Sequence, residues 1–217
     1  MTEAANLTLA QRYQSAWASY LTDWQHVDTE LINLVRTHSS GSFEDIHLRV
    51  VFMNGIYRAQ LNRTIGSNAD FVAAKAIQSQ WLTVTKVVAP LAAFAEPSVK
   101  AMSAVATAHD TIVTILQCAF PKSGRATSFA SKFLWPDAPN LVPIFDSYTD
   151  EHARRHRLDY AAAFQSLRAA IAHVQVSSVY FEHALRYLAT YQTLAASGIP
   201  SNVSITMKGI DHMYWVG

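Results

Sequence analysis

The sequence predicts an all-α fold, a compact two-lobed helical domain of roughly nine or ten helices. Apolar residues recur every three or four positions through most of the chain, which is the spacing of amphipathic helices. Ser, Thr, Asn or Asp precedes many of these segments and Gly or Pro follows them, as at helix ends. The strongest strand candidate, residues 203–206, is short. A chain of 217 residues fits one helical domain, 1–217, either undivided or built of lobes 1–120 and 121–217.

The composition is that of a globular protein with a sizeable core, because half of the residues are hydrophobic and 15% are charged. A net charge of +1 argues against a protein that coats nucleic acid, although it leaves room for a local basic patch. The single Cys118 excludes an internal disulfide, and its apolar neighbours predict a buried thiol. The first residues are polar and the longest apolar runs are too short for a bilayer. We therefore expect a cytoplasmic protein without a membrane partner.

The first third of the chain contains three predicted helices. Thr8 and Gln11 have the spacing of a capping box and begin the first. Asp28 is expected to cap a short second helix that stops at residues 39–41, and Ser42 begins the third.

The third helix contains the pair Asn54-Gly55, which is unusual because neither residue favours a helix. One interpretation is a close helix crossing at Gly55. The other is that Asn54 and Tyr57, one helical turn apart, face a pocket.

The remaining elements follow in order along the chain. Residues 68–70 precede a long apolar helix that bends or ends near Pro90, and Glu96-Pro97 begins another that runs to Phe120. After a turn at 121–124, a helix ends at Trp135, a Pro-rich loop covers 136–143, and a second helix opens at 144–148. Further helices are predicted from Asp159, from 177–178 and from about 201 to 215.

Common cofactor and nucleophile motifs are missing: the sequence has no GxxxxGK(S/T), GxGxxG, HExxH, CxxC or GxSxG. No cofactor is therefore expected. His152 and His156 lie four residues apart and could share one helix face, as metal ligands do. The arginines Arg154, Arg155 and Arg157 around them favour a cation-rich helix instead, so no metal site is predicted.

Two charged residues lie in apolar surroundings on either side of the Pro-rich loop. Asp146, three residues after Pro143, is suited either to cap a helix or to act as a general base or stabiliser of a cation. Lys132 lies in the run Phe129 to Leu134, where burial would lower its pKa and favour a nucleophile. The alternative is that its ammonium group reaches water.

This segment, SFASKFLWPDAPNLVPIFDSYTDEHARR, resembles the helix-hairpin-helix DNA glycosylase superfamily, and more closely its divergent bacterial branch with an oxoguanine-glycosylase-like fold. The matching features are Ser-Lys followed by aromatic and apolar residues, then Pro-Ile-aromatic-Asp-Ser. The fragments MNGIY at 53–57 and IDHMYW at 210–215 add to the resemblance. The Leu-Pro-Gly-Val-Gly hairpin of the family is absent here, and Lys132 lies closer to Asp146 than the family's lysine does to its aspartate.

The resemblance implies an enzyme that hydrolyses the N-glycosidic bond of a modified base flipped out of DNA, such as foreign DNA. Asp146 would be the base or oxocarbenium stabiliser, and Lys132 a conditional Schiff-base partner. Six residues would bind the phosphates of double-stranded DNA: Lys122, Gly124, Arg125, Arg154, Arg155 and Arg157. Five would line the base pocket: Asn54, Tyr57, Trp135, Tyr148 and Trp215.

Two other functions are compatible with the same residues. One is a non-catalytic module of the same fold that binds DNA or protein, in which Asp146 only caps a helix and Lys132 only packs. The other is a helical scaffold for another protein, with residues 154–157 as a solvated face.

Overall fold

The structure, a computed structural model, describes residues 7–57, 59, 61, 68–121, 126–171 and 178–216. Within these ranges it is all-helical, as predicted, with eleven α-helices, three short 3-10 helices and no strand. The α-helices are α1 (Leu9–Asp23), α2 (Gln25–Thr37), α3 (Phe43–Gly55), α5 (Ala69–Ser79), α6 (Trp81–Val88), α7 (Val99–Ala119), α8 (Ala126–Leu134), α9 (Ser147–Arg155), α10 (Ala161–Ala170), α11 (Val179–Ala196) and α12 (Met207–Val216). The 3-10 helices are η2 (Ala89–Ala93), η3 (Trp135–Asp137) and η4 (Arg157–Tyr160).

Several helix starts are set by local side-chain chemistry. Thr8 and Gln11 form the predicted capping box at the start of α1. Ser42, Ser98 and Ser178 each accept a hydrogen bond from the backbone N–H three residues later, at the starts of α3, α7 and α11. These bonds satisfy N–H groups that have no partner inside a helix, which is why capping residues predict helix starts well.

The helix predicted from residue 68 to about Pro90 is instead two helices, α5 and α6, with a break at Gln80. Directly after the break, the Trp81 indole packs on Gly41. Gly41 has a φ of +78°, and a Cβ there would lie 2.1 Å from Trp81 Nε1. The apolar spacing continues across the break, so the sequence pattern does not reveal it.

The last helix begins at Met207 rather than near residue 201. The Tyr13 hydroxyl donates to the Ser204 carbonyl oxygen at 2.8 Å and accepts from the Thr206 N–H at 3.0 Å. Both bonds use backbone groups that a longer helix would need, so this segment stays non-helical and is not a strand either.

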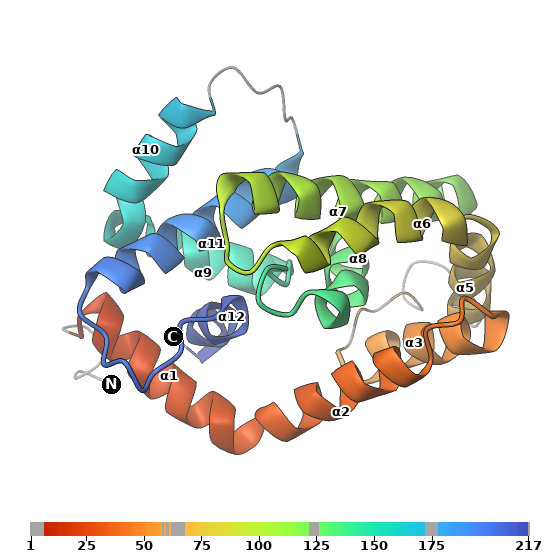
Figure 1. The fold of residues 1–217 in the computed structure, drawn as a ribbon, viewed down its shortest axis with the longest axis horizontal. Helices are drawn as coiled ribbons and strands as arrows, with labels where there is room; N and C mark the ends of the chain where they lie inside the picture. The colour runs from red at the N-terminus through yellow and green to blue at the C-terminus, as the bar shows by residue number, and fades with distance from the viewer. Residues whose placement is uncertain are drawn as a thin grey trace.

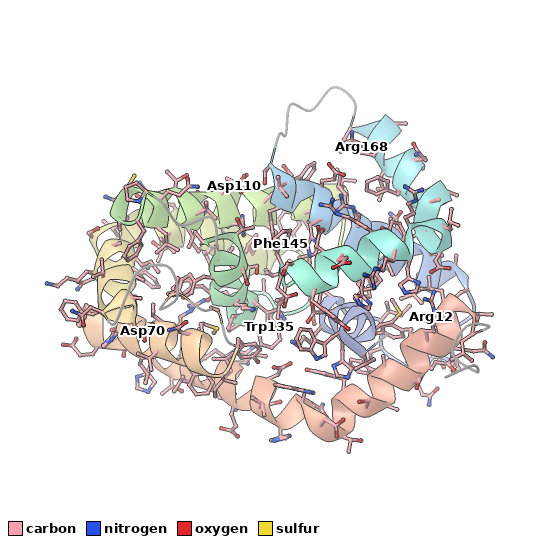
Figure 2. The ribbon with its side chains drawn as sticks, turned by 180° about the vertical axis from the view of Figure 1, so that it is seen from behind. Arg12, Asp70, Asp110, Trp135, Phe145 and Arg168 are labelled. Atoms are coloured by element: carbon pink, nitrogen blue, oxygen red, sulfur yellow. The ribbon has the colours of Figure 1, made fainter. Side chains whose placement is uncertain are left out.

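Helices α8, α9 and α12 lie in the middle of the molecule, whereas α10 projects at one side (Figure 1). Helix α7 packs against α5, α6, α8 and α11, while α12 packs against α1, α9 and α11. Trp135, just after α8, and Phe145, just before α9, lie toward the centre in Figure 2. The end of α8, the start of α9 and α12 are thereby brought together.

We expect Gly209→Ala to destabilise the protein, because Gly209 is where α12 meets α1. A Cβ at Gly209 would lie 2.3 Å from the Tyr13 hydroxyl oxygen and 3.0 Å from the Trp17 ring. Overpacking of this kind costs about 1–3 kcal/mol of unfolding free energy, measurable by urea denaturation. Gly55→Ala, at the last residue of α3, is the matched control: apart from its chain neighbours and the backbone of its own helix, nothing lies within 4 Å of its Cβ position, so alanine should be tolerated there. Equal stability of the two variants would contradict the prediction.

The surface of α7 corrects one expectation from the sequence. Cys118 is exposed, so the prediction of a buried thiol was wrong. Its neighbour Leu116 faces the core, whereas Cys118 lies on the outer side of α7. Among the helices of the described residues, none has the length and apolar character needed to cross a membrane.

Candidate functional site

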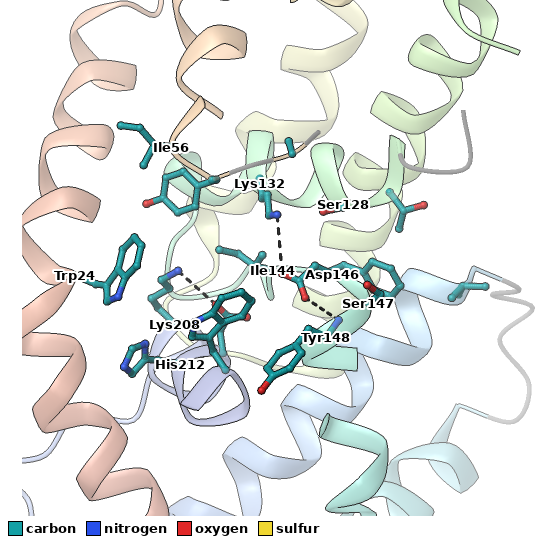
Figure 3. A pocket seen from close by; sticks show the side chains of 17 residues that line it. Trp24, Ile56, Ser128, Lys132, Ile144, Asp146, Ser147, Tyr148, Lys208 and His212 are labelled. Carbon is teal, nitrogen blue, oxygen red and sulfur yellow. Dashed lines mark hydrogen bonds and ion pairs between the residues drawn. The ribbon is translucent and has the colours of Figure 1, made fainter. Parts of the chain in front are cut away.

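Lys132 and Asp146 lie next to each other in the lining of one pocket. Lys132 lies in the last turn of α8, and Asp146 is the N-cap residue of α9. The loop between the two helices folds back, so that Lys132 Nζ lies 4.0 Å from Asp146 Oδ2 (Figure 3). The two residues singled out from the sequence are therefore close enough to act on one substrate.

The two oxygens of the Asp146 carboxylate have different partners. Oδ1 accepts hydrogen bonds from the backbone N–H groups of Tyr148 and Thr149, both at 3.0 Å. Oδ2 faces Lys132. Asp146 thus caps α9 and also presents an oxygen to the pocket, so the capping and functional interpretations are geometrically compatible.

Lys132 is buried, with its side chain only 8% exposed. Burial lowers the pKa of Lys132, and the nearby negative charge of Asp146 opposes part of this effect. The side chain is thus buried at the pocket rather than extended along the surface. A lowered pKa increases the fraction of neutral amine, the form that attacks electrophilic carbon.

The backbone that precedes Asp146 is fixed by hydrogen bonds from two helices. The Ser131 hydroxyl on α8 accepts from the Phe145 N–H at 2.9 Å. On α11, the Tyr180 hydroxyl donates to the Pro143 carbonyl oxygen at 2.9 Å, and His183 Nε2 lies 3.2 Å from the Ile144 carbonyl oxygen. Ser131 therefore positions the loop segment that leads into Asp146. The next residue of α8, Lys132, faces the Asp146 side chain.

Helix α9 is docked on α11 through Asp150, one turn after Asp146. Asp150 Oδ1 lies 3.1 Å from His183 Nδ1 and 2.8 Å from Arg186 Nη1, and Oδ2 lies 2.8 Å from Arg154 Nη2. Burial alone would raise the pKa of Asp150. The hydrogen bond from His183 and the nearby cations outweigh burial and hold the pKa below its usual value.

The pocket around Lys132 and Asp146 has a volume of about 980 Å³. That size is in the range of small-molecule sites. Its lining includes three exposed aromatic side chains: Trp24 at the junction of α1 and α2, Tyr148 on α9, and Trp215 on α12. The Tyr148 and Trp215 rings meet edge to face with centroids 5.1 Å apart. Such rings can stack on a planar ligand.

Lys208 and Asp211 of α12 also line the pocket, and sequence reasoning did not select them. Lys208 Nζ lies 3.4 Å from Asp211 Oδ2, and the Tyr187 hydroxyl donates to Asp211 Oδ1 at 3.2 Å. Burial raises the pKa of Asp211. Residues 208, 211, 212 and 215 have the spacing of one helix face, which is the signal that could have identified them.

Asp28 lies within the first turn of α2 and is buried, whereas it was expected to cap that helix. It accepts hydrogen bonds from the hydroxyls of Tyr20 and Tyr57, and Lys208 Nζ lies 3.9 Å from Asp28 Oδ2. Burial, followed by the charge of Asp28, raises the pKa of both tyrosines, so both hydroxyls stay protonated as donors. Asp28 thus supports the pocket wall that contains Tyr57 and Lys208.

Five of the predicted catalytic and pocket residues line this pocket: Lys132, Asp146, Tyr57, Tyr148 and Trp215. Asn54 is not among the lining residues. Its side chain donates to Asp70 Oδ1 at 2.8 Å and accepts from the Leu61 N–H at 2.9 Å, which ties α3 to the following segment and to α5. Trp135 is buried, and its ring centroid lies 6.2 Å from that of Tyr57. It therefore packs behind the pocket wall that Tyr57 forms.

The residues predicted to contact phosphate either do not line the pocket or fall outside the residues that the structure describes. Lys122, Gly124 and Arg125 fall outside the described residues. Arg154, Arg155 and Arg157 are exposed and do not line the pocket; the first two pair with Asp150 and Glu151. Phosphate binding by these residues stays a prediction.

The histidine pair considered as metal ligands does not converge. The His152 ring packs on Tyr148 with centroids 4.3 Å apart, whereas His156 Nδ1 lies 2.6 Å from Arg12 Nη1. In the part of the chain that the structure describes, no three His, Cys, Asp or Glu side chains are grouped to hold a metal ion.

Comparison with known proteins adds no relative: no family model matches the chain, and neither curated proteins nor solved structures show a significant match.

Proposed function

We propose that the protein is a DNA glycosylase-like enzyme that cleaves the N-glycosidic bond of a modified base flipped out of DNA. The observation that carries this proposal is the Lys132–Asp146 pair, 4.0 Å apart on one pocket. A buried lysine and a partly exposed aspartate are the two groups that such a reaction uses. The resemblance of residues 128–155 to the helix-hairpin-helix glycosylases also supports it.

The pocket suits a flipped nucleotide in size and character. Its volume of about 980 Å³ accommodates a base and its sugar, and Trp24, Tyr148 and Trp215 offer planar faces beside the opening. Extrusion breaks base stacking, and aromatic contacts compensate part of that cost. The base would enter the pocket with its sugar C1′ beside Asp146.

Bond cleavage leaves positive charge on the sugar as the base departs with the bonding electron pair. The carboxylate of Asp146 would stabilise this oxocarbenium-like centre through Oδ2. In the hydrolytic route, water adds to C1′ and Asp146 takes its proton. In the lysine route, the neutral Lys132 amine adds to C1′ and loses a proton, and opening of the sugar ring gives a Schiff base.

The alternative function, a binding module without catalysis, is favoured by one observation. Asp146 makes two capping hydrogen bonds, which suffice to explain an aspartate at this position. A screen of base release from duplexes that each contain one modified base separates the two functions. We expect release from at least one duplex and DNA binding that weakens with salt. Salt-dependent binding without any release would support the module.

Borohydride trapping tests the role of Lys132. We expect wild-type protein to form a covalent adduct with its substrate duplex and Lys132→Met to form none, as shown by gel electrophoresis. Because burial lowers the pKa of Lys132 from 10.5, the neutral fraction grows with pH and the trapping rate should reach half of its maximum below pH 10.5.

The matched control is Lys86→Met, which changes an exposed lysine on α6 outside the pocket and should trap as well as wild type. Base release without an adduct in the wild-type protein would exclude the Schiff base and leave the hydrolytic route. An adduct in Lys132→Met would assign the nucleophile to another residue.

A further inference from the structure

We propose that Lys208 reads the flipped base: it selects neutral bases that present a carbonyl oxygen and rejects cationic, N-alkylated bases. This inference rests on the proposed function and adds the substrate class to it. Lys208 comes from α12, whereas Lys132 and Asp146 come from α8 and the start of α9. The three residues line the same pocket (Figure 3).

The Lys208 ammonium is held in place from several sides. Its Nζ lies 3.4 Å from Asp211 Oδ2 and 3.9 Å from Asp28 Oδ2. It also lies over two aromatic rings, 5.4 Å from the Tyr57 centroid and 5.3 Å from the Trp135 centroid. The side chain is only 13% exposed. These contacts make Lys208 a positioned charge rather than a mobile surface lysine.

The Lys208 ammonium group has hydrogen-bond donors that no described residue accepts. An ammonium group carries three N–H donors. Among the described residues, the 3.4 Å contact to Asp211 is its one hydrogen bond, and the 3.9 Å separation from Asp28 is too long for another. The remaining donors lie on a pocket-lining residue, where a carbonyl oxygen of a bound base can accept one of them.

The same arrangement disfavours a cationic base. Aromatic faces are a principal means by which proteins bind planar cations. Here the Tyr57 and Trp135 rings already have the Lys208 ammonium over them, and Asp28 and Asp211 already pair with it. A cationic base would meet the positive charge of Lys208 in the pocket. A neutral base with a carbonyl edge meets a donor instead.

Binding of free nucleosides to the wild-type protein tests the inference without requiring catalysis. Two matched pairs serve as probes: deoxyuridine against 3-methyldeoxycytidine, and deoxyinosine against 1-methyldeoxyadenosine. The second member of each pair is cationic at neutral pH. In NMR titrations we expect at least one neutral member to bind at least about tenfold more tightly than its cationic counterpart, the scale of a charge-assisted hydrogen bond. Equal or tighter binding of the cations in both pairs would overturn the inference.

The variant Lys208→Met gives the reciprocal test. It removes the ammonium from the Tyr57 ring and from the Asp211 carboxylate, both of which line the pocket, so binding of the neutral nucleosides should weaken about tenfold and binding of the cationic ones should strengthen. Lys86→Met is the control and should bind as wild type does. Circular dichroism tests whether the variant is folded. If Lys208→Met does not fold, the comparison of neutral and cationic nucleosides on the wild-type protein still tests the inference. Unchanged selectivity in a folded Lys208→Met would count against the role of Lys208.

Different results would contradict the proposed glycosylase activity and the proposed role of Lys208. Selective nucleoside binding without base release from any duplex would retain base reading by Lys208 and remove the glycosylase activity. Release of cationic bases at rates that match or exceed those of neutral ones would retain the activity and overturn the selectivity.

Discussion

Asp146→Asn is expected to lower the rate of base release about 100- to 10,000-fold while leaving the protein folded and stable. The amide cannot accept a proton from water, and it carries no charge to stabilise the developing cation at C1′. Its carbonyl oxygen can still accept the N–H groups of Tyr148 and Thr149, because asparagine caps helices about as well as aspartate. Single-turnover base release and urea denaturation measure the two effects.

Two further variants separate catalysis from capping at Asp146. Asp146→Ala removes both functions and should also cost about 1 kcal/mol of stability. Glu151→Gln makes the same kind of carboxylate-to-amide change at an exposed residue of α9 outside the pocket, and it should release base at the wild-type rate. If Asp146→Asn also releases base at that rate, Asp146 is a capping residue only.

Asp150→Ala is expected to lower the free energy of unfolding by about 1–3 kcal/mol. Asp150 is largely buried and contacts His183, Arg186 and Arg154. Its removal takes away the 2.8 Å contact between Arg186 Nη1 and Asp150 Oδ1, while Glu182 Oε1 still pairs with Arg186 Nη2 at 2.6 Å. Because this cluster docks α9, urea denaturation should show the loss of stability and base release should fall with the fraction folded.

Acid should weaken the same cluster. The hydrogen bond from His183 and the neighbouring cations hold the pKa of Asp150 below 3.8 in the folded protein, despite the opposing effect of burial. A lowered folded pKa adds stability above pH 3.8, and this contribution disappears as the pH falls through the folded pKa. Asp150→Ala should therefore lose less stability than wild type between pH 5 and 2.

Glu151→Ala is the matched control, since Glu151 is exposed and pairs with Arg155 on the surface of α9. Exposed pairs contribute about 0–1 kcal/mol. Similar losses of stability in Asp150→Ala and Glu151→Ala would show that the Asp150 cluster does not hold α9 in place.

Local chemistry made most of the fold predictable. The helical class follows from apolar spacing, and starts such as those at Thr8 and Ser42 follow from side chains that bond their own backbone. These interactions span a few residues and leave a readable pattern. The late start of α12 at Met207 was missed, because it depends on the Tyr13 hydroxyl from the other end of the chain.

The residues of the candidate site also divide into those that the sequence could identify and those that it could not. Lys132 and Asp146 were identifiable because each is a charged residue in an apolar segment beside a Pro-rich loop. Asn54 and Trp135 were expected in the pocket but do not line it. The Asn54 side chain bonds Asp70, and Trp135 packs behind Tyr57, because the direction of each side chain depends on how the helices pack.

The sequence by itself determined that this chain is helical, where most helices begin, and which loop carries the acidic and basic candidates. Only the tertiary structure decided that Lys132 Nζ and Asp146 Oδ2 lie 4.0 Å apart, and that Lys208 completes the pocket. The helix starts that were predicted depend on bonds between neighbouring residues, whereas a pocket depends on the packing of helices distant in sequence. The burial that lowers the pKa of Lys132 and the aromatic rings beneath Lys208 arise only from that packing.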